Sequence, residues 1–323
     1  MFKHNLPFEK PGRFYRGNIH CHSTPSDGTL SPEDVVAAYR EQGYDFLAIT
    51  DHFWYYDGKG VTDTRSLGTP SFVTLLGAEL HGPGQENGAL WHIIALGLPP
   101  DFSPPAPDET GPDLARRAAV AGAFIGLAHP HWSGLTLADI ETVPVAHALE
   151  TMNATCSLKW DRGNSWYISD LCSMAGRHLT TYAADDAHFV TQTDCFGAWI
   201  HVRAETFTPE ALLASLKAGH YYASEGPEIQ HIGLTDHAIA ITASEDCSMC
   251  ITGPHSGGPF HSTDVPIAAT ASTIHGQQGT VSHAEHGFVT VTSPLRTLPG
   301  PYCRVTVTDA AGKRAWSNPN WFA

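Results

Sequence analysis

The chain has 323 residues and 42% hydrophobic content, enough for one large domain with a smaller one and for a sizeable core. Its formal net charge of −15 disfavours long nucleic acid as a partner, because neutralising phosphates needs lysine and arginine. No apolar stretch approaches the roughly 20 residues that span a bilayer, and the first residues lack the apolar core of a signal peptide, so we expect no membrane contact. Seven cysteines, an odd number, fit a reducing compartment, and we expect a cytoplasmic location.

The first motif follows a short strand-like run, Phe14 to Ile19. His20 and His22 close this run, and a turn over residues 25–28 comes next. Residues two apart on an extended strand point to the same face, so both imidazoles can bind one cation while Cys21 between them faces away. An isolated pair among 20 histidines can equally be hydrogen-bonded and structural, so the rest of the chain has to decide between these alternatives.

Further acidic or histidine clusters follow most of the later apolar runs. They are Thr50-Asp51-His52 after Phe46 to Ile49, Glu79 after Phe72 to Leu76, His129-Pro130-His131 after Phe124 to Ala128, and Asp185-Asp186-Ala187-His188 after Leu179 to Ala184. His92 instead opens a run, Ile93 to Leu98, behind a turn-rich segment that predicts a hairpin loop. An antiparallel return strand would place His92 beside the end of the strand that carries Glu79.

Helix signals alternate with these apolar runs as far as residue 224. The expected helices are about Pro32 to Gly43, Pro112 to Gly122, Ser165 to Gly176 and Thr208 to Gly219. This alternation predicts an α/β fold with a mainly parallel sheet or barrel, in which side chains at the carboxyl ends of the strands meet. From Glu225 onward, short alternating runs between turns predict a small all-β, sandwich-like domain. We therefore expect two domains, 1–224 and 225–323.

In this order the motifs resemble the polymerase and histidinol phosphatase (PHP) family of metallohydrolases. The resemblance covers about residues 14 to 224 and rests on H-C-H-S-T-P-S-D-G, I-T-D-H, the lone Glu79, W-H-I-I-A-L-G, L-A-H-P-H and D-D-A-H. Two later segments, Tyr221 to Ile229 and Ala315 to Pro319, look like the branch that includes carbaryl-type carbamate hydrolases. The resemblance implies a distorted seven-stranded β/α barrel, followed here by the small all-β domain.

The same resemblance implies nine side chains that hold two or three divalent metal ions. The first metal would be bound by His20, His22, Glu79 and Asp186, the second by Glu79, His92 and His129, and the third by Asp27, His52 and His188. Asp27 stands where some members of the family have histidine. Imidazole and carboxylate ligands suit zinc, manganese and iron. Asp51 and Asp185 point the other way on extended backbone, so we expect structural roles for both.

The implied reaction is hydrolysis of a small phosphate ester by a metal-bridging hydroxide, with Glu79 and Asp186 as bridging and orienting groups. A phosphate needs cationic partners, and Lys159 and Arg162 lie in the loop after Ala148 to Asn153. A surface role accounts for these two residues equally well.

Two other functions stay open. Aromatic residues stand next to presumed ligands, namely Trp54, Tyr55, Tyr56, Trp91, Trp132 and Trp160, and they could wall a pocket for a flat substrate. Together with the C-terminal resemblance, they keep a carbamate or amide ester hydrolase as the alternative, with His131 as a candidate proton donor. The third hypothesis, a non-catalytic metal-binding regulatory module, is disfavoured because open metal positions suited to water activation have no structural purpose.

Overall fold

The protein is described by a computed structural model over residues 6–191, 193–235, 238–255, 258–265, 273–274, 277–278, 280–284, 288–294 and 301–321. Its helices are α1 (Pro32–Glu41), α2 (Gly111–Val120), α3 (Pro130–Ser133), α4 (Leu137–Glu141), α5 (Ala154–Trp160), α6 (Trp166–Met174) and α7 (Pro209–Lys217), with short 3-10 turns η1 (Pro7–Glu9) and η2 (Arg65–Leu67). The longest of them, α1 and α2, have 10 residues each, and no helix in the described part is long and apolar enough to cross a membrane.

The strands fall into an earlier and a later group. The earlier ones are β1 (Arg13–Asn18), β2 (Phe46–Ile49), β3 (His52–Phe53), β4 (Val73–Gly82), β5 (Trp91–Leu96), β6 (Phe124–Leu127), β7 (Ala148–Asn153), β8 (Thr180–Ala184), β9 (Trp199–Ala204) and β10 (Tyr221–Ser224). The later ones are β11 (Ile229–Leu234), β12 (Ala238–Ser244), β13 (Ser248–His255), β14 (Gly258–Val265), β15 (Thr273–Ile274), β16 (Gln277–Gln278), β17 (Thr280–Ala284), β18 (Phe288–Pro294), β19 (Tyr302–Thr308), β20 (Arg314–Ser317) and β21 (Asn320–Trp321).

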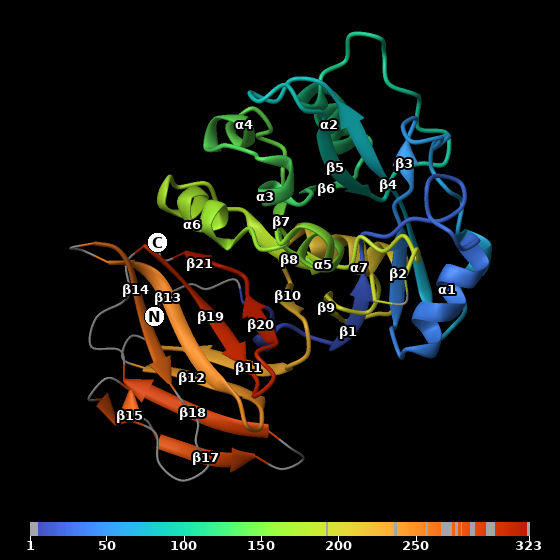
Figure 1. Cartoon of the computed structure of the whole chain (residues 1–323). Coiled ribbons are helices and arrows are strands. Elements are labelled where there is room, and N and C mark those ends of the chain that lie inside the picture. The colour runs from blue at the N-terminus through green and yellow to red at the C-terminus, as the bar shows by residue number, and fades with distance from the viewer. Residues whose placement is uncertain are drawn as a thin grey trace.

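The main sheet is mixed and runs in the order β14-β13-β19-β20-β10-β9-β1-β2-β4-β5-β6-β7-β8. The helices lie between the earlier strands in the sequence, whereas every described element beyond residue 225 is a strand (Figure 1). The predicted α/β class is thereby confirmed at the level of a mixed α/β fold with a large sheet. The closed seven-stranded barrel and the separate all-β domain stay predictions.

The helices begin where the sequence places hydroxyl caps. Ser31, Thr110 and Thr208 each accept a hydrogen bond at the side-chain oxygen from a backbone N–H three residues later, at the starts of α1, α2 and α7. A proline stands in the first turn of each of these helices, where its missing N–H costs no bond. These local signals account for helix bounds close to the expected ones.

Strand pairing brings the early motifs to one end of the sheet. Strand β5 returns antiparallel to β4 and pairs His92 with His81, which confirms the expected hairpin. An isolated parallel bridge pairs Cys21 with Ala187, beyond the ends of β1 and β8. Beside it, the His22 N–H donates to the Ala187 carbonyl at 2.8 Å. The segments after β1 and β8, far apart in sequence, therefore lie side by side.

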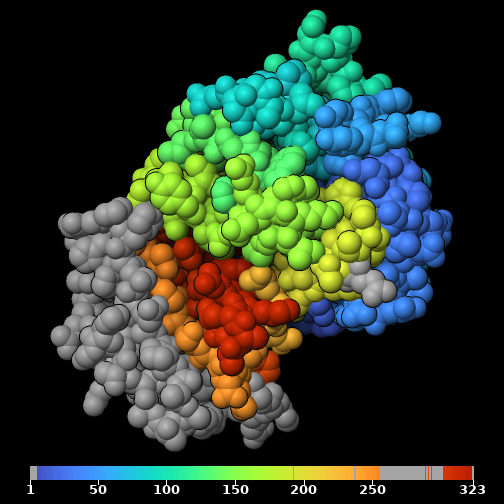
Figure 2. Space-filling view, viewed as in Figure 1, coloured from blue at the N-terminus to red at the C-terminus, as the bar shows by residue number. Residues whose placement is uncertain are grey.

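The sheet continues across the expected domain boundary at residue 224. Strand β20 pairs antiparallel with β10, so Ala223 lies opposite Trp316. Just beyond β20, Asn318 accepts a hydrogen bond from the Thr181 N–H of β8 at 2.8 Å and donates to the carbonyl of Tyr221 at 2.9 Å. Figure 2 shows the resulting packing of the C-terminal strands against the helical part of the molecule. The domain boundary at 224 stays a prediction. Beyond it, β13, β14, β19 and β20 belong to the main sheet, whereas β11, β12, β17 and β18 form a separate four-stranded sheet.

A buried ion pair also joins α6 to β19. Arg304 donates from Nε to Asp170 Oδ1 at 3.2 Å and from Nη2 to Oδ2 at 3.1 Å, and both side chains are about 10% exposed. The guanidinium lies 4.3 Å from the ring centre of Trp166. Because both charges are removed from water, each depends on the other for solvation.

Replacing Asp170 by alanine leaves the Arg304 charge buried without its partner, and we expect a loss of about 3 kcal/mol in the free energy of unfolding. Urea denaturation measures it. Asp113→Ala is the matched control, because Asp113 pairs with Arg116 at 2.6 Å on an exposed surface. This control should cost under about 1 kcal/mol. Equal losses in the two variants would contradict a stabilising role for the α6–β19 pair.

Candidate metal centre

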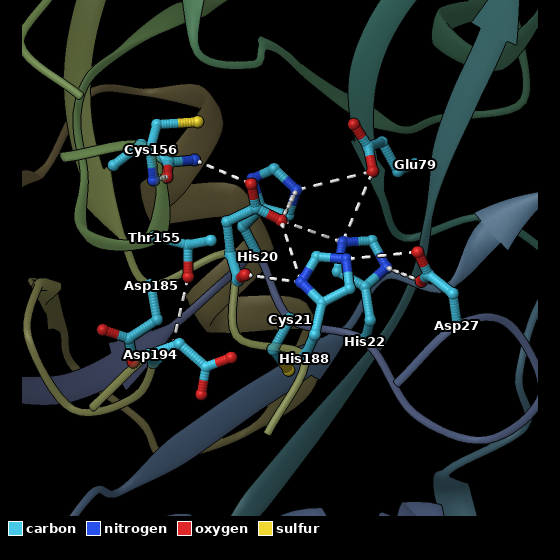
Figure 3. Close-up of polar contacts among 12 residues, drawn as sticks. His20, Cys21, His22, Asp27, Glu79, Thr155, Cys156, Asp185, His188 and Asp194 are labelled. Atoms are coloured by element: carbon cyan, nitrogen blue, oxygen red, sulfur yellow. Dashed lines mark hydrogen bonds and ion pairs between the residues drawn. The ribbon is translucent and has the colours of Figure 1, made fainter. Parts of the chain in front are cut away.

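All nine side chains expected to bind metal belong to overlapping groups whose donor atoms lie within 4.8 Å of one another. These groups contain His20, His22, Asp27, His52, Glu79, His92, His129, Asp186 and His188, joined by His81. The residues come from the segments that follow β1 and β8, from β3, β4 and β5, and from the N-cap of α3. Figure 3 shows the imidazoles of His20, His22 and His188 converging with the carboxylate of Glu79 on one side.

The carboxylate of Glu79 is the centre of the cluster. It is buried, and its Oε1 lies 2.7 Å from Nδ1 of His92 and 3.4 Å from Nε2 of His129. On the other side, Oε2 lies 3.5 Å and 3.4 Å from Nε2 of His20 and His22. Oε2 also lies 2.9 Å from Nδ1 of His52. The two oxygens of one carboxylate thus face different groups of imidazoles, the arrangement in which a glutamate bridges two ions.

Asp186 completes the group around the first imidazole pair. Its Oδ1 lies 3.2 Å from Nε2 of His20 and 3.1 Å from Nε2 of His22. Both Asp186 (φ 54°) and His129 (φ 30°) have left-handed backbone, which residues other than glycine rarely adopt. Such conformations cluster at functional sites, where the surrounding structure holds them in place.

A third group lies nearer to solvent around Asp27, whose side chain is 36% exposed. Asp27 Oδ1 lies 3.4 Å from Nε2 of His52, and Oδ2 lies 3.4 Å from Nε2 of His188. The ring centre of His22 lies 4.3 Å from that of each of these two imidazoles, whose own centres are 6.1 Å apart. The third group therefore adjoins the first through His22.

Charges within the cluster shift the pKa values of its members. Burial lowers the pKa of His20, but the carboxylates of Asp186, Glu150 and Glu79 outweigh it and raise the pKa well above its usual value. Burial likewise lowers the pKa of His52, yet the neighbouring carboxylates raise it to about 10. For Glu79, burial raises the pKa, and the surrounding imidazoles bring it well below its ordinary value. Metal binding at these groups would accordingly release protons from imidazoles.

The residues present fit divalent metal ions. Three buried side-chain atoms that could bind a metal ion make no hydrogen bond. They are Nε2 of His20, Nδ1 of His22 and Oε2 of Glu79. A buried polar atom without a partner is costly, whereas coordination to a cation satisfies it. Imidazole nitrogen and carboxylate oxygen are also the ligand types of zinc, manganese and iron.

Glu150, on β7, orients a ligand of the cluster, and the sequence analysis did not predict this role. Its Oε1 lies 3.0 Å from Nδ1 of His20, and because a carboxylate only accepts, Nδ1 carries the proton and Nε2 is left for a metal. The other oxygen, Oε2, accepts from the His129 N–H at 2.7 Å and from Nδ2 of Asn153 at 3.0 Å. A charged residue inside the apolar run Ala148 to Asn153 was the available signal.

We expect Glu150→Gln to lower metal affinity about 10- to 100-fold, the usual effect of removing a partner that orients a ligand. The amide can present its NH₂ group to His20, which removes the preference for a free Nε2. Competition with a fluorescent chelator measures the affinity. Glu210→Gln, at an exposed position on α7, is the control and should bind metal as the natural sequence does. Equal affinities in the two variants would contradict the orienting role.

His81 is a second residue that the motif analysis missed. It is buried, and its Nε2 lies 2.8 Å from Nδ1 of His52, which needs one proton between the two nitrogens. In the neutral form of His52 that donates from Nδ1 to His81, Nε2 faces Asp27 and is free to bind a metal ion. His81 lies two residues after Glu79 on β4, so strand alternation alone places both side chains on one face.

Asp51 and Asp185 contact hydrogen-bond donors of neighbouring loops. Asp51 accepts from the N–H of Ser23 at 2.6 Å and from the hydroxyl of Ser26 at 2.7 Å. Asp185 accepts from the Tyr39 hydroxyl at 2.7 Å and from backbone N–H groups of residues 196–198. In Figure 3 the carboxylate of Asp185 points away from the imidazoles. These contacts fix the loops that carry the ligands.

A cavity of about 260 Å³ opens onto the cluster. It is lined by Asp27, His52, Tyr56, Glu79, His92, His129, Trp132, Thr155, Cys156, Trp160, Asp186 and His188. Three of the aromatic residues singled out in the sequence, Tyr56, Trp132 and Trp160, thus line it, whereas Trp91 is fully buried in the core.

The three residues predicted to act on the substrate lie outside this lining. Lys159 places Nζ 3.9 Å from Oδ2 of Asp194, and Arg162 is exposed. His131 is exposed as well, with Nδ1 3.1 Å from the carbonyl of Asn164. The roles of Lys159, Arg162 and His131 stay predictions.

Comparison with known proteins gives partial matches. No family model matches the chain. A stretch of 87 residues is 32% identical to the DNA polymerase/3'-5' exonuclease PolX of Bacillus subtilis, and covers 27% of this chain and 14% of that protein. Another of 35 residues is 51% identical to a 5'-3' exoribonuclease of Haemophilus influenzae, covering 11% of this chain and 13% of that protein. The matched segments are thus small parts of both relatives.

The fold has a solved counterpart. A two-domain protein from Bacteroides vulgatus, described as containing a predicted PHP-like metal-dependent phosphoesterase, superposes with a TM-score of 0.53 at 15% identity. The superposition covers 94% of each chain. The mixed α/β architecture, including the later strands, is therefore shared with that protein over nearly the whole length.

Proposed function

We propose that this protein is a metal-dependent hydrolase of the PHP family and that it cleaves small phosphate esters. The observation that carries the proposal is the position of Glu79, whose two oxygens face different groups of imidazoles beside a cavity. A purely structural metal site has no need of an adjoining cavity, because its ligands close the coordination sphere. A non-catalytic regulatory module is disfavoured for this reason.

The partial matches support the phosphoester class. The two curated relatives are named as nucleases, which act on phosphodiesters, and the solved protein with the same fold is described as phosphoesterase-like. The net charge of −15 still disfavours long nucleic acid, so the proposed substrate is a small ester. We also propose the finer architecture of the family, a seven-stranded barrel completed by the Cys21–Ala187 bridge and followed by a β domain over 225–323.

Three groups of residues would hold two or three divalent ions. They are His20, His22, Glu79 and Asp186; Glu79, His92 and His129; and Asp27, His52 and His188. Such ions, whether zinc, manganese or iron, supply acidification of water and stabilisation of negative charge on the substrate. Glu79 and Asp186 fix the spacing of the groups, and Glu150 fixes the ring of His20. Thr155 and Cys156 form part of the cavity wall.

One observation favours an alternative, hydrolysis of a carbamate or amide ester at the same centre. Neither lysine nor arginine is among the residues that line the cavity, and a neutral ester needs no such cation. This alternative also agrees with the C-terminal segments that look like the carbaryl-type branch.

Hydrolysis assays on metal-quantified protein distinguish these functions. One panel holds aryl phosphate mono- and diesters, and the other holds aryl N-methylcarbamates and carboxylate esters. His20→Ala and Asp186→Ala are tested alongside. Phosphoester turnover that disappears in both variants together with bound metal supports the leading proposal. Turnover of carbamates or carboxylate esters alone selects the alternative. No turnover on either panel by protein with bound metal would overturn both proposed functions.

A further inference from the structure

The cavity beside the metal ligands has an aromatic wall made of Tyr56, Trp132 and Trp160. These residues come from the loop after β3, from α3 and from the last position of α5. The rings of Trp132 and Trp160 are 5.7 Å apart at an angle of 55°. Trp132 also contacts the ring of His129 at 4.9 Å, so the wall reaches from the ligands to the mouth of the cavity.

Core packing does not account for this wall. Trp160 is 50% exposed and Tyr56 is 51% exposed, although each has a large apolar surface that burial would stabilise. Tyr56 lies 4.9 Å from the ring of His52 and has left-handed backbone (φ 43°), as does the following Asp57 (φ 64°). Backbone of this kind is rare outside glycine and is held at sites of ligand contact. The loop therefore presents an aromatic ring over a metal ligand.

Basic side chains other than histidine are missing from the same lining. Among the residues that the structure describes, its ionisable members apart from Tyr56 and Cys156 are carboxylates and imidazoles of the metal cluster, and it contains neither lysine nor arginine. The nearby Lys159 has Asp194 as its anionic neighbour at 3.9 Å. The part of a substrate that lies away from the metals consequently meets ring faces.

On the basis of the proposed function, we infer that the substrate carries a planar ring system as well as the scissile ester, and that Trp160 and Tyr56 determine specificity by stacking on it. About 150 Å³ is enough for a benzene molecule, so a cavity of about 260 Å³ holds one ring together with the ester group. The shared chemistry is a flat unsaturated ring, and a simple aryl group and a nucleobase are its two sources.

The test compares each substrate that carries a planar ring with a partner that lacks one. Phenyl phosphate is paired with cyclohexyl phosphate, and phenyl N-methylcarbamate with its cyclohexyl analogue. Adenosine 5'-monophosphate paired with ribose 5-phosphate tests the nucleobase as the source. The kinetic constants kcat and KM are measured for the natural sequence, Trp160→Leu, Trp160→Phe and Tyr56→Leu, and bound metal is quantified in each. Tyr167→Leu is the control, because Tyr167 is 71% exposed on α6 and lies outside the cavity lining.

We expect Trp160→Leu to raise KM for the planar member about tenfold, the size of effect that loss of one base–aromatic stack produces. KM for the saturated member and the metal content should stay the same. Trp160→Phe should keep most of the preference for the planar member of each pair. Tyr56→Leu should lower this preference, as Trp160→Leu does. A change confined to the phenyl pairs identifies an aryl substrate, and a change in the adenosine pair identifies a nucleobase.

Binding without turnover separates this inference from the proposed function. Phenylphosphonate and cyclohexylphosphonate have a C–P bond in place of the ester link and are not hydrolysed, so calorimetry gives their affinities for the metal-loaded protein. Preference for the phenyl compound that Trp160→Leu removes supports the aromatic subsite even where no ester is turned over. The inference is overturned if Trp160→Leu and Tyr56→Leu both bind metal normally and leave the ratio of phenyl to cyclohexyl affinity unchanged. The proposed hydrolase function would be unaffected by that result.

Discussion

Glu79→Gln is expected to lower kcat/KM by about three orders of magnitude, equivalent to ~4 kcal/mol of transition-state stabilisation. The reason is that one carboxylate serves both neighbouring groups, facing His92 and His129 with Oε1 and His20 and His22 with Oε2. A neutral amide has one oxygen, cannot bridge two cations as an anion, and leaves the imidazoles without their central negative charge. Bound metal should fall together with activity.

Elemental analysis of the dialysed protein and steady-state hydrolysis measure this prediction. The control is Glu33→Gln, an isosteric change at an exposed position in the first turn of α1. It should keep both metal content and turnover. A Glu79→Gln protein with full metal content and normal turnover would show that the central carboxylate has no part in the site.

Removal of metal by a chelator should lower the Tm by about 15 °C. Ions that bind only the native state stabilise it by about 4 kcal/mol per site when present at ~1,000 times Kd. Each kcal/mol shifts the Tm of a chain of this size by roughly 2 °C, so two filled sites account for the expected change. Without ions, the cluster keeps buried donors such as Nε2 of His20 and Oε2 of Glu79 unsatisfied.

Thermal unfolding followed by circular dichroism, before and after dialysis against chelator, measures this shift. Adding back zinc, manganese or iron(II) one at a time shows which ion restores the Tm. The Glu79→Gln protein provides the internal comparison, because its Tm should respond weakly to the chelator. Identical melting of the natural sequence with and without chelator would contradict metal binding at the cluster.

The early motifs could be predicted because their geometry is local. His20 and His22 share a face through strand alternation, and His92 is brought to Glu79 by a hairpin whose turn residues are visible in the sequence. Parallel pairing then gathers the strand ends, as sequence alternation between strands and helices indicated. Glu79 itself lies within β4 and not after it, since that strand is longer than its apolar run.

The residues that were missed act through contacts at long range. Glu150 orients His20 from 130 positions away, and the motif carries no signal for that pairing. The pairing of β10 with β20 is equally invisible, because periodicity predicts a strand but not its partner. Lys159 was expected in a loop but lies in α5, with Nζ 3.9 Å from Oδ2 of Asp194, and its contact with the substrate stays a prediction.

The hydrogen bonds of Asn318 bear on when the protein can become active during its synthesis. Asn318 satisfies the backbone of β8 at Thr181, 137 residues earlier in the chain, and β8 leads directly into Asp186. At ~5–20 residues per second, a ribosome needs roughly ten seconds to add that length. The histidines and acids that precede β8 are therefore synthesised well before Asn318 can complete the hydrogen bonding of that strand.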